Sequence, residues 1–95
     1  MASEKPNASW AITIAHLAEA RFYLPQRLGS EQAQKIYAQF SEYLDLNELD
    51  LALDEAESLG SVCNAPPAFW RELQLAAANL HMTDSEARFA ALAAG

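Results

Sequence analysis

The sequence predicts an all-α protein, a compact bundle of about five short antiparallel helices, and three observations carry that prediction. The 95 residues are enough for one domain with its own core and too few for two ordinary ones. Twenty alanines and thirteen leucines stand against only six β-branched residues, a balance that favours helix over sheet. Capping and turn residues divide the chain into five amphipathic segments with short connections, which is typical of an antiparallel bundle. We therefore expect a flexible N-terminal arm over residues 1–7 and a single helical domain over residues 8–95.

The first helix is predicted from Ser9 to Tyr23, because Pro25 disfavours a helical conformation in the residue before it. Its predicted core-facing residues are Trp10, Ile14, Leu17 and Leu24, widened by Ala11, Ala18 and Phe22. On the opposite side lies an outer stripe with helical spacing, formed by Ile12, His16, Glu19 and Tyr23. Such a stripe is either covered by another helix or forms a binding surface, because apolar groups flanked by polar ones are typical of interfaces.

The second helix is predicted from an N-cap at Ser30 to Leu44, with Glu31 placed favourably against the helix dipole. Its apolar side chains recur at intervals of three and four residues, as expected for one buried helix face. They are Ala33, Ile36, Tyr37, Phe40, Tyr43 and Leu44.

The third helix is predicted to take Asn47 as its N-cap, with Asp50 in its first turn, and to end at Gly60 in the left-handed conformation. The expected buried residues are Leu49, Ala52, Leu53, Ala56 and Leu59. The acidic residues then fall on the two flanks, with Asp50, Asp54 and Glu57 on one and Glu48 and Glu55 on the other. Leu51 points outward between the flanks.

Two further helices follow an expected irregular connection over residues 60–65. Pro67 suits the first turn of a helix that runs to about His81. Trp70 is expected at the edge of the buried face of this helix. The expected buried residues of this helix are Phe69, Leu73, Ala76, Ala77 and Leu80. Thr83 and Glu86 have the spacing of a capping box, which predicts a last helix through Phe89 and Leu92.

Charge is distributed unevenly along the chain. The net charge of −7 disfavours direct binding to nucleic acid or to an anionic membrane, because like charges repel. No Lys or Arg falls between Ile36 and Trp70. Seven acidic residues do, namely Glu42, Asp45, Glu48, Asp50, Asp54, Glu55 and Glu57. This stretch therefore carries the whole net charge, and it is either a solvated face or a docking surface for a cationic partner.

The predicted partner surface combines these acids with apolar side chains. Charge complementarity mainly raises the association rate, so tight binding also needs apolar anchors. The predicted partner-binding residues are Glu42, Asp45, Glu48, Asp50, Leu51, Asp54, Glu55 and Glu57, together with Ile12, Glu19 and Tyr23 on the first helix.

No constellation of residues indicates catalysis. His16 and His81 stand far apart in the sequence and Cys63 falls in an expected loop, so none has metal-ligand spacing with another. The chain contains no nucleophile motif, and its three glycines form no phosphate-binding loop. We expect no enzymatic activity, no metal and no cofactor. A single cysteine cannot form an internal disulfide, so a cytoplasmic location is the default expectation.

The segment from Tyr43 to Gly60, with Phe69–Leu73 and Leu80–Met82, resembles the MafI-type family of small helical immunity proteins linked to contact-dependent growth inhibition. The matching residues are Glu48, Leu51, Ala52, Leu53 and Ala56 in the first part, and Trp70, Leu73, Leu80 and Met82 in the second. Asn47 stands where the pattern has glycine, and the first helix lies outside the match.

This resemblance implies a cytoplasmic antidote that binds the toxic C-terminal domain of a polymorphic or contact-dependent toxin, often a nuclease. Such a domain carries a cationic substrate channel that an acidic surface can occupy. The alternative is an acidic helical interaction module, such as a secretion chaperone or a subunit of a larger complex. In either case we expect a monomer when the protein is free.

Overall fold

A computed structural model describes residues 8–25 and 27–95 of the chain. Over these residues it contains five helices and no strand, which confirms the predicted all-α bundle. The helices are α1 (Ala8–Arg21), α2 (Glu31–Asp45), α3 (Leu49–Cys63), α4 (Pro67–Asn79) and α5 (Thr83–Ala93). The predicted N-terminal arm, residues 1–7, lies outside the described residues.

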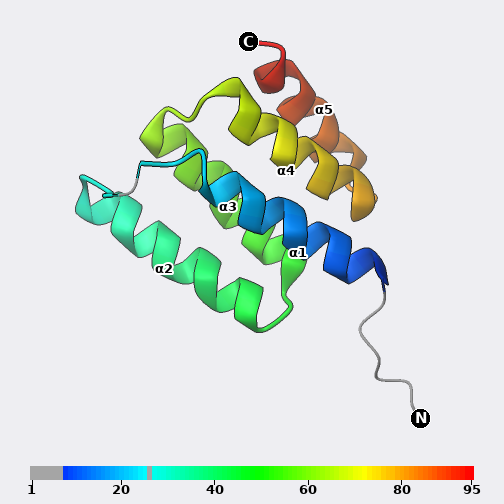
Figure 1. Ribbon diagram of the computed structural model, residues 1–95, viewed down its shortest axis with the longest axis horizontal. Coiled ribbons are helices and arrows are strands. Elements are labelled where there is room, and N and C mark those ends of the chain that lie inside the picture. The colour runs from blue at the N-terminus through cyan, green and yellow to red at the C-terminus, as the bar shows by residue number, and fades with distance from the viewer. Residues whose placement is uncertain (1–7, 26) are drawn as a thin grey trace.

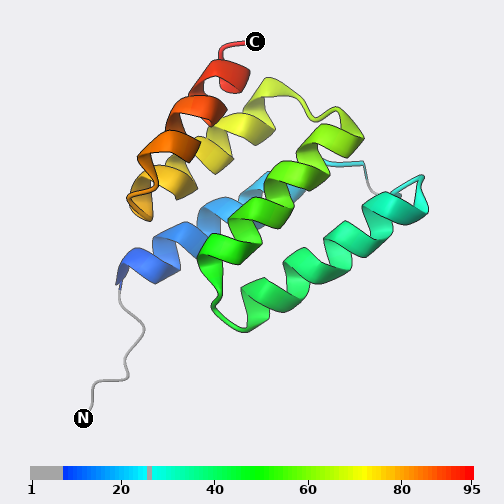
Figure 2. The ribbon, with the colours of Figure 1, turned by 180° about the vertical axis from the view of Figure 1, so that it is seen from behind.

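The helices pack in antiparallel pairs (Figure 1). The most extensive contacts join α4 to α5, α2 to α3 and α1 to α4. In Figure 1 α1 crosses in front of α3, with α2 on one side of this crossing and α4 and α5 on the other. Figure 2, seen from behind, shows α3 in front and α1 at the back. The helices α1 and α3 therefore cover opposite faces of the molecule.

All five helices contribute to one apolar core. Its largest fully buried side chains include Phe40 of α2, Phe69 of α4 and Phe89 of α5. The ring of Trp70 stacks on Phe89 with centroids 5.9 Å apart and meets the edge of Phe69 at 5.1 Å. Trp70 is only 6% exposed, so its predicted place at the edge of the core is wrong. Aromatic rings from α4 and α5 thus form the centre of the fold.

The buried face of α1 differs from the predicted one. Thr13, Leu17 and Ala20 are buried, whereas Trp10 is 42% and Phe22 80% exposed. Two small side chains beside a leucine let α1 approach α4 closely, and the Thr13 hydroxyl accepts a hydrogen bond from Asn79 Nδ2 at 2.7 Å. Because this hydrogen bond satisfies the buried hydroxyl, Thr13 can lie in the core, where the prediction placed only apolar side chains of the first helix.

The predicted N-terminus of α2 is confirmed. Ser30 is the N-cap, and its side chain accepts a hydrogen bond from the Ala33 amide at 3.0 Å. The last helix, α5, begins at Thr83 as predicted, but its N-cap is Met82 and no side chain caps it. Thr83 already lies in the first turn, so the capping box does not form.

Three helix ends share one turn that the sequence analysis missed. Asn47, Asn64 and His81 have left-handed backbones, with φ of 59°, 54° and 61°. In each case the next residue donates a backbone hydrogen bond to the carbonyl five residues before it, such as Glu48 to Tyr43 at 2.9 Å. This is the Schellman arrangement, which favours glycine and tolerates asparagine. Asn47 therefore ends α2 and does not cap α3, contrary to the prediction.

Gly60 lies inside α3 and does not end it, contrary to the prediction. The helix continues to Cys63, so most of the expected irregular connection is helical. A Cβ at Gly60 would lie 2.4 Å from Phe69 Cε2 and 2.8 Å from Trp70 Cη2. Glycine is needed here because α4 packs its aromatic rings directly against the α3 backbone.

Candidate functional site

Five exposed carboxylates gather on α2, α3 and the turn between them. They belong to Glu42, Asp45, Glu48, Asp50 and Asp54, and we call this group the acidic surface. Over the described residues, none of the five makes an ion pair with a basic side chain. Glu42 accepts a long hydrogen bond of 3.5 Å from Gln39. These five predicted site residues are therefore exposed and make no ion pair within the described part of the chain.

The packing of α3 explains this exposure. The helix buries the five predicted apolar residues, Leu49, Ala52, Leu53, Ala56 and Leu59. These side chains face the other helices, so the residues between them must face away from the core. In Figure 2 no helix crosses in front of α3, and its outer side is open along its length.

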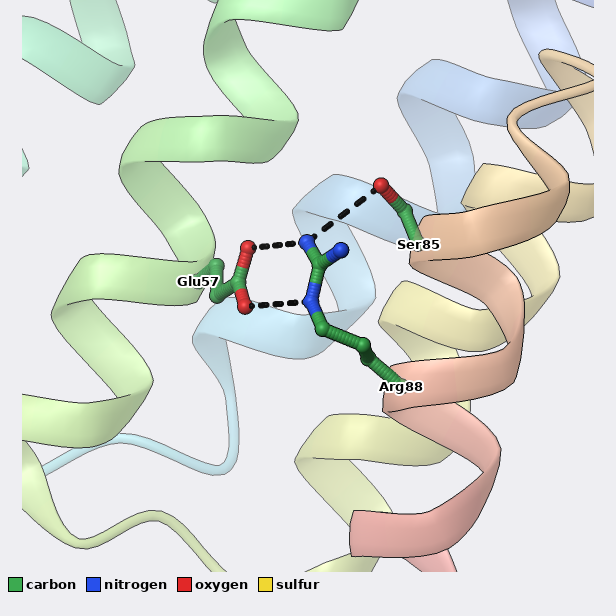
Figure 3. Close-up of polar contacts among 3 residues, drawn as sticks. All are labelled: Glu57, Ser85 and Arg88. Carbon is green, nitrogen blue, oxygen red and sulfur yellow. Dashed lines mark hydrogen bonds and ion pairs between the residues drawn. The ribbon is translucent and has the colours of Figure 1, made fainter.

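Glu57 differs from the other acids because it is paired. Arg88 of α5 donates two hydrogen bonds to its carboxylate, from Nη2 at 2.8 Å and from Nε at 3.1 Å (Figure 3). Arg88 also reaches Ser85 Oγ at 3.4 Å. The hydrogen bond and charge of Glu57, with smaller effects of Asp54 and Asp84, raise the pKa of Arg88. The prediction that the acids of this stretch are uncompensated is wrong for Glu57, which ties α3 to α5.

Apolar side chains lie among the acids. Leu51 is 38% exposed, as predicted from its position on α3. Leu46, between Asp45 and the left-handed turn, is 61% exposed and was not predicted as a site residue. Its acidic neighbour Asp45, with Glu48 two residues on, was the available signal. Glu55, on the other flank of α3, is half-buried.

The outer stripe of α1 is partly exposed and lies elsewhere. Ile12 is 49% and Tyr23 39% exposed, and Glu19 is exposed as well. His16 is half-buried, and its Nδ1 lies 2.8 Å from Glu72 Oε1 of α4. In Figure 1 α1 lies in front of α3, and in Figure 2 α3 lies in front of α1, so the helix that carries Ile12 and the helix that carries Asp50 and Asp54 cover opposite faces.

Among residues 8–25 and 27–95 no group of three His, Cys, Asp or Glu side chains has the arrangement of a metal site. Cys63, at the end of α3, is half-buried, and this burial raises the pKa of its thiol. In the same described ranges no helix is long and apolar enough to span a bilayer. The acidic surface thus offers exposed negative charges and, in the same stretch of chain, the exposed leucines Leu46 and Leu51.

No family model, curated protein or solved structure matches this chain.

Proposed function

We propose that this protein is an immunity protein that binds and neutralises the toxic C-terminal domain of a polymorphic or contact-dependent bacterial toxin. The proposed partner is a basic, nuclease-like domain. The observation that carries the proposal is the acidic surface, whose five exposed carboxylates form no ion pair within the described part of the chain. The protein acts by stoichiometric binding, with no chemical step of its own.

Charge supports this choice of partner. A nuclease must hold an anionic substrate, so its channel is lined by cations. An acidic surface on the inhibitor is attracted to such a channel, and the attraction raises the association rate. At an ionic strength of 0.15 M the screening length is about 8 Å, so the carboxylates act mainly on groups that dock directly against them.

The exposed leucines provide apolar contacts, which slow dissociation, whereas the charges mainly raise the association rate. Leu46 and Leu51 lie among the carboxylates, and their burial against a partner would slow dissociation. An immunity protein needs slow dissociation because a small amount of free toxin is harmful. Truncating Leu46 to alanine removes an apolar side chain that is already 61% exposed, so we expect a faster off-rate and an unchanged fold.

The MafI-type resemblance agrees with this division between core and surface. Of its matching residues, Leu53, Ala56 and Leu73 are buried in the core. Glu48 and Leu51 are exposed on the acidic surface. Proteins that share both a fold and a docking surface are expected to share buried core residues as well as exposed surface residues, and the matching residues include both.

The test pairs the protein with the domain encoded next to it and measures growth and toxin activity across molar ratios. Protection that becomes complete at one immunity protein per toxin supports the proposal. Protection far below that ratio would mean catalytic inactivation. No protection at any ratio would leave the acidic helical interaction module, a secretion chaperone or complex subunit, as the better description.

A matched pair of variants tests the role of the acidic surface. Asp50 and Glu31 both lie in the first turn of a helix, so reversing either to lysine disturbs a helix dipole and changes the net charge equally. We expect Asp50→Lys to slow association with the toxin domain by roughly three- to tenfold at low salt, and Glu31→Lys to have little effect. Equal association rates for the two variants would contradict the proposed docking face.

A further inference from the structure

A pocket of about 480 Å³ lies between the end of α1, the following loop and α2, and it does not belong to the acidic surface. Phe22, Leu24, Leu28 and Tyr37 form much of its apolar lining. Backbone hydrogen bonds hold this wall, from Phe22 to Glu19 and from Leu24 to Arg21, and Gln34 Nε2 donates to the Leu28 carbonyl at 3.0 Å. The pocket is therefore a built feature of this part of the fold.

Arg21 is the one charged residue in the lining. Its guanidinium lies over the ring of Tyr37, with Cζ 5.5 Å from the ring centroid. This cation–π contact places the cation of Arg21 at the aromatic wall of the pocket. Over the described residues Arg21 makes no ion pair with a carboxylate. A guanidinium without an ion-pair partner beside an apolar wall is suited to a carboxylate on a ligand.

The local charge favours the same ligand class. From Ala18 to Tyr37 the chain has three basic residues, Arg21, Arg27 and Lys35, against the two acids Glu19 and Glu31. This segment has a net charge of +1, so the remainder of the chain has −8. The pocket thus lies in the basic part of an acidic protein, and an anion is attracted to this part rather than to α3.

Size distinguishes a small molecule from a single side chain of a partner. A cavity of about 150 Å³ accepts a benzene ring, so a pocket of 480 Å³ holds a chain or ring system larger than one side chain. Phe22 is 80% exposed although it lines the pocket, the highest exposure among the large apolar residues described. A bound apolar group would cover this ring.

We propose that this pocket binds a small amphiphilic carboxylate. Its apolar chain or ring lies against Phe22, Leu28 and Tyr37, and its carboxylate accepts hydrogen bonds from Arg21. The proposal stands apart from the proposed immunity function, because no residue of the acidic surface lines the pocket.

The test titrates the full chain with decanoate, below its micelle concentration, and follows backbone amide chemical shifts. Decanol is the uncharged comparison of the same chain length. We expect saturable shifts confined to residues 18–37, with decanoate bound about fivefold more tightly than decanol at 0.15 M salt. Equal affinity for both ligands would overturn the recognition of the carboxylate, and shifts centred on other residues would overturn the site.

Three variants separate the contributions. Arg21→Gln should lower the affinity for decanoate to that for decanol, while Arg71→Gln, an exposed arginine of α4, leaves it unchanged. Phe22→Ala removes an exposed ring, so the fold is kept and the affinity for both ligands falls. Circular dichroism verifies the fold of each variant. An equal loss of decanoate binding in Arg71→Gln and Arg21→Gln would show attraction to net charge only, against the proposal.

Discussion

Replacing Gly60 by alanine tests the closest packing contact in the fold. Alanine is favoured over glycine in a helix by roughly 0.5–1 kcal/mol, and Gly60 is interior to α3. The new Cβ, however, would lie 2.4 Å from Phe69 and 2.8 Å from Trp70, whose rings are 1% and 6% exposed. The rings of Phe69 and Trp70 pack against each other, and Trp70 also packs against Phe89, so neither ring has much space to move. Overpacking of this kind costs about 1–3 kcal/mol, and two blocked rings favour the upper value.

Subtracting the helix gain from about 3 kcal/mol leaves a net loss of roughly 2 kcal/mol. For a domain of this length that corresponds to a fall in Tm of about 10 °C. Urea unfolding followed by circular dichroism measures the change in the free energy of unfolding. Gly29→Ala is the matched control, because a Cβ there has no heavy atom within 4 Å. If Gly60→Ala were as stable as Gly29→Ala, the argument from close packing of α4 on α3 would be refuted.

Two further predictions concern single residues. Asn47 has φ of 59°, so Asn47→Gly should be neutral or stabilising, whereas Asn47→Ala should lower the free energy of unfolding by about 1 kcal/mol. Thermal unfolding of the two variants tests this prediction. Equal stability of the two variants would contradict the left-handed turn. Burial raises the pKa of the Cys63 thiol, so its alkylation by iodoacetamide should reach half its maximal rate at a higher pH than that of free cysteine. A midpoint at or below that of free cysteine would show that the thiol is not desolvated.

The sequence predicts well what local periodicity determines. The five buried residues of α3 recur at intervals of three and four, and all five face the core. The helix starts at Ser30 and Pro67 were predictable because both effects are local. Ser30 caps α2 through its own side chain, and Pro67 is the first residue of α4. The exposure of the acids follows from the same periodicity, since residues between buried positions must point outward.

Other features depend on contacts between different helices, which the periodicity of a single helix does not predict. Glu57 is paired with Arg88, which is 31 residues away in the sequence, so this ion pair follows only from the tertiary arrangement that brings Arg88 of α5 within reach of α3. Gly60 has two possible reasons to be glycine, a left-handed backbone or a close neighbour, and only the position of Trp70 decides between them. Thr13 is buried because Asn79 satisfies its hydroxyl, a partner from another helix.

The helix α2 contributes to both surfaces, and its geometry predicts that the two act independently. Tyr37, near its middle, lines the pocket, whereas Glu42 and Asp45 of the acidic surface are five and eight positions further on, or about 8 and 12 Å along the helix axis. Coupling between separate sites requires an element with two alternative arrangements, whereas α2 is one continuous helix from Glu31 to Asp45. Substitutions this far apart without shared partners usually add to within about 0.5 kcal/mol. The variant that combines Arg21→Gln with Asp50→Lys should therefore show the decanoate affinity of the first and the toxin association rate of the second. A deviation larger than about 0.5 kcal/mol in either quantity would mean that α2 shifts when one surface is occupied.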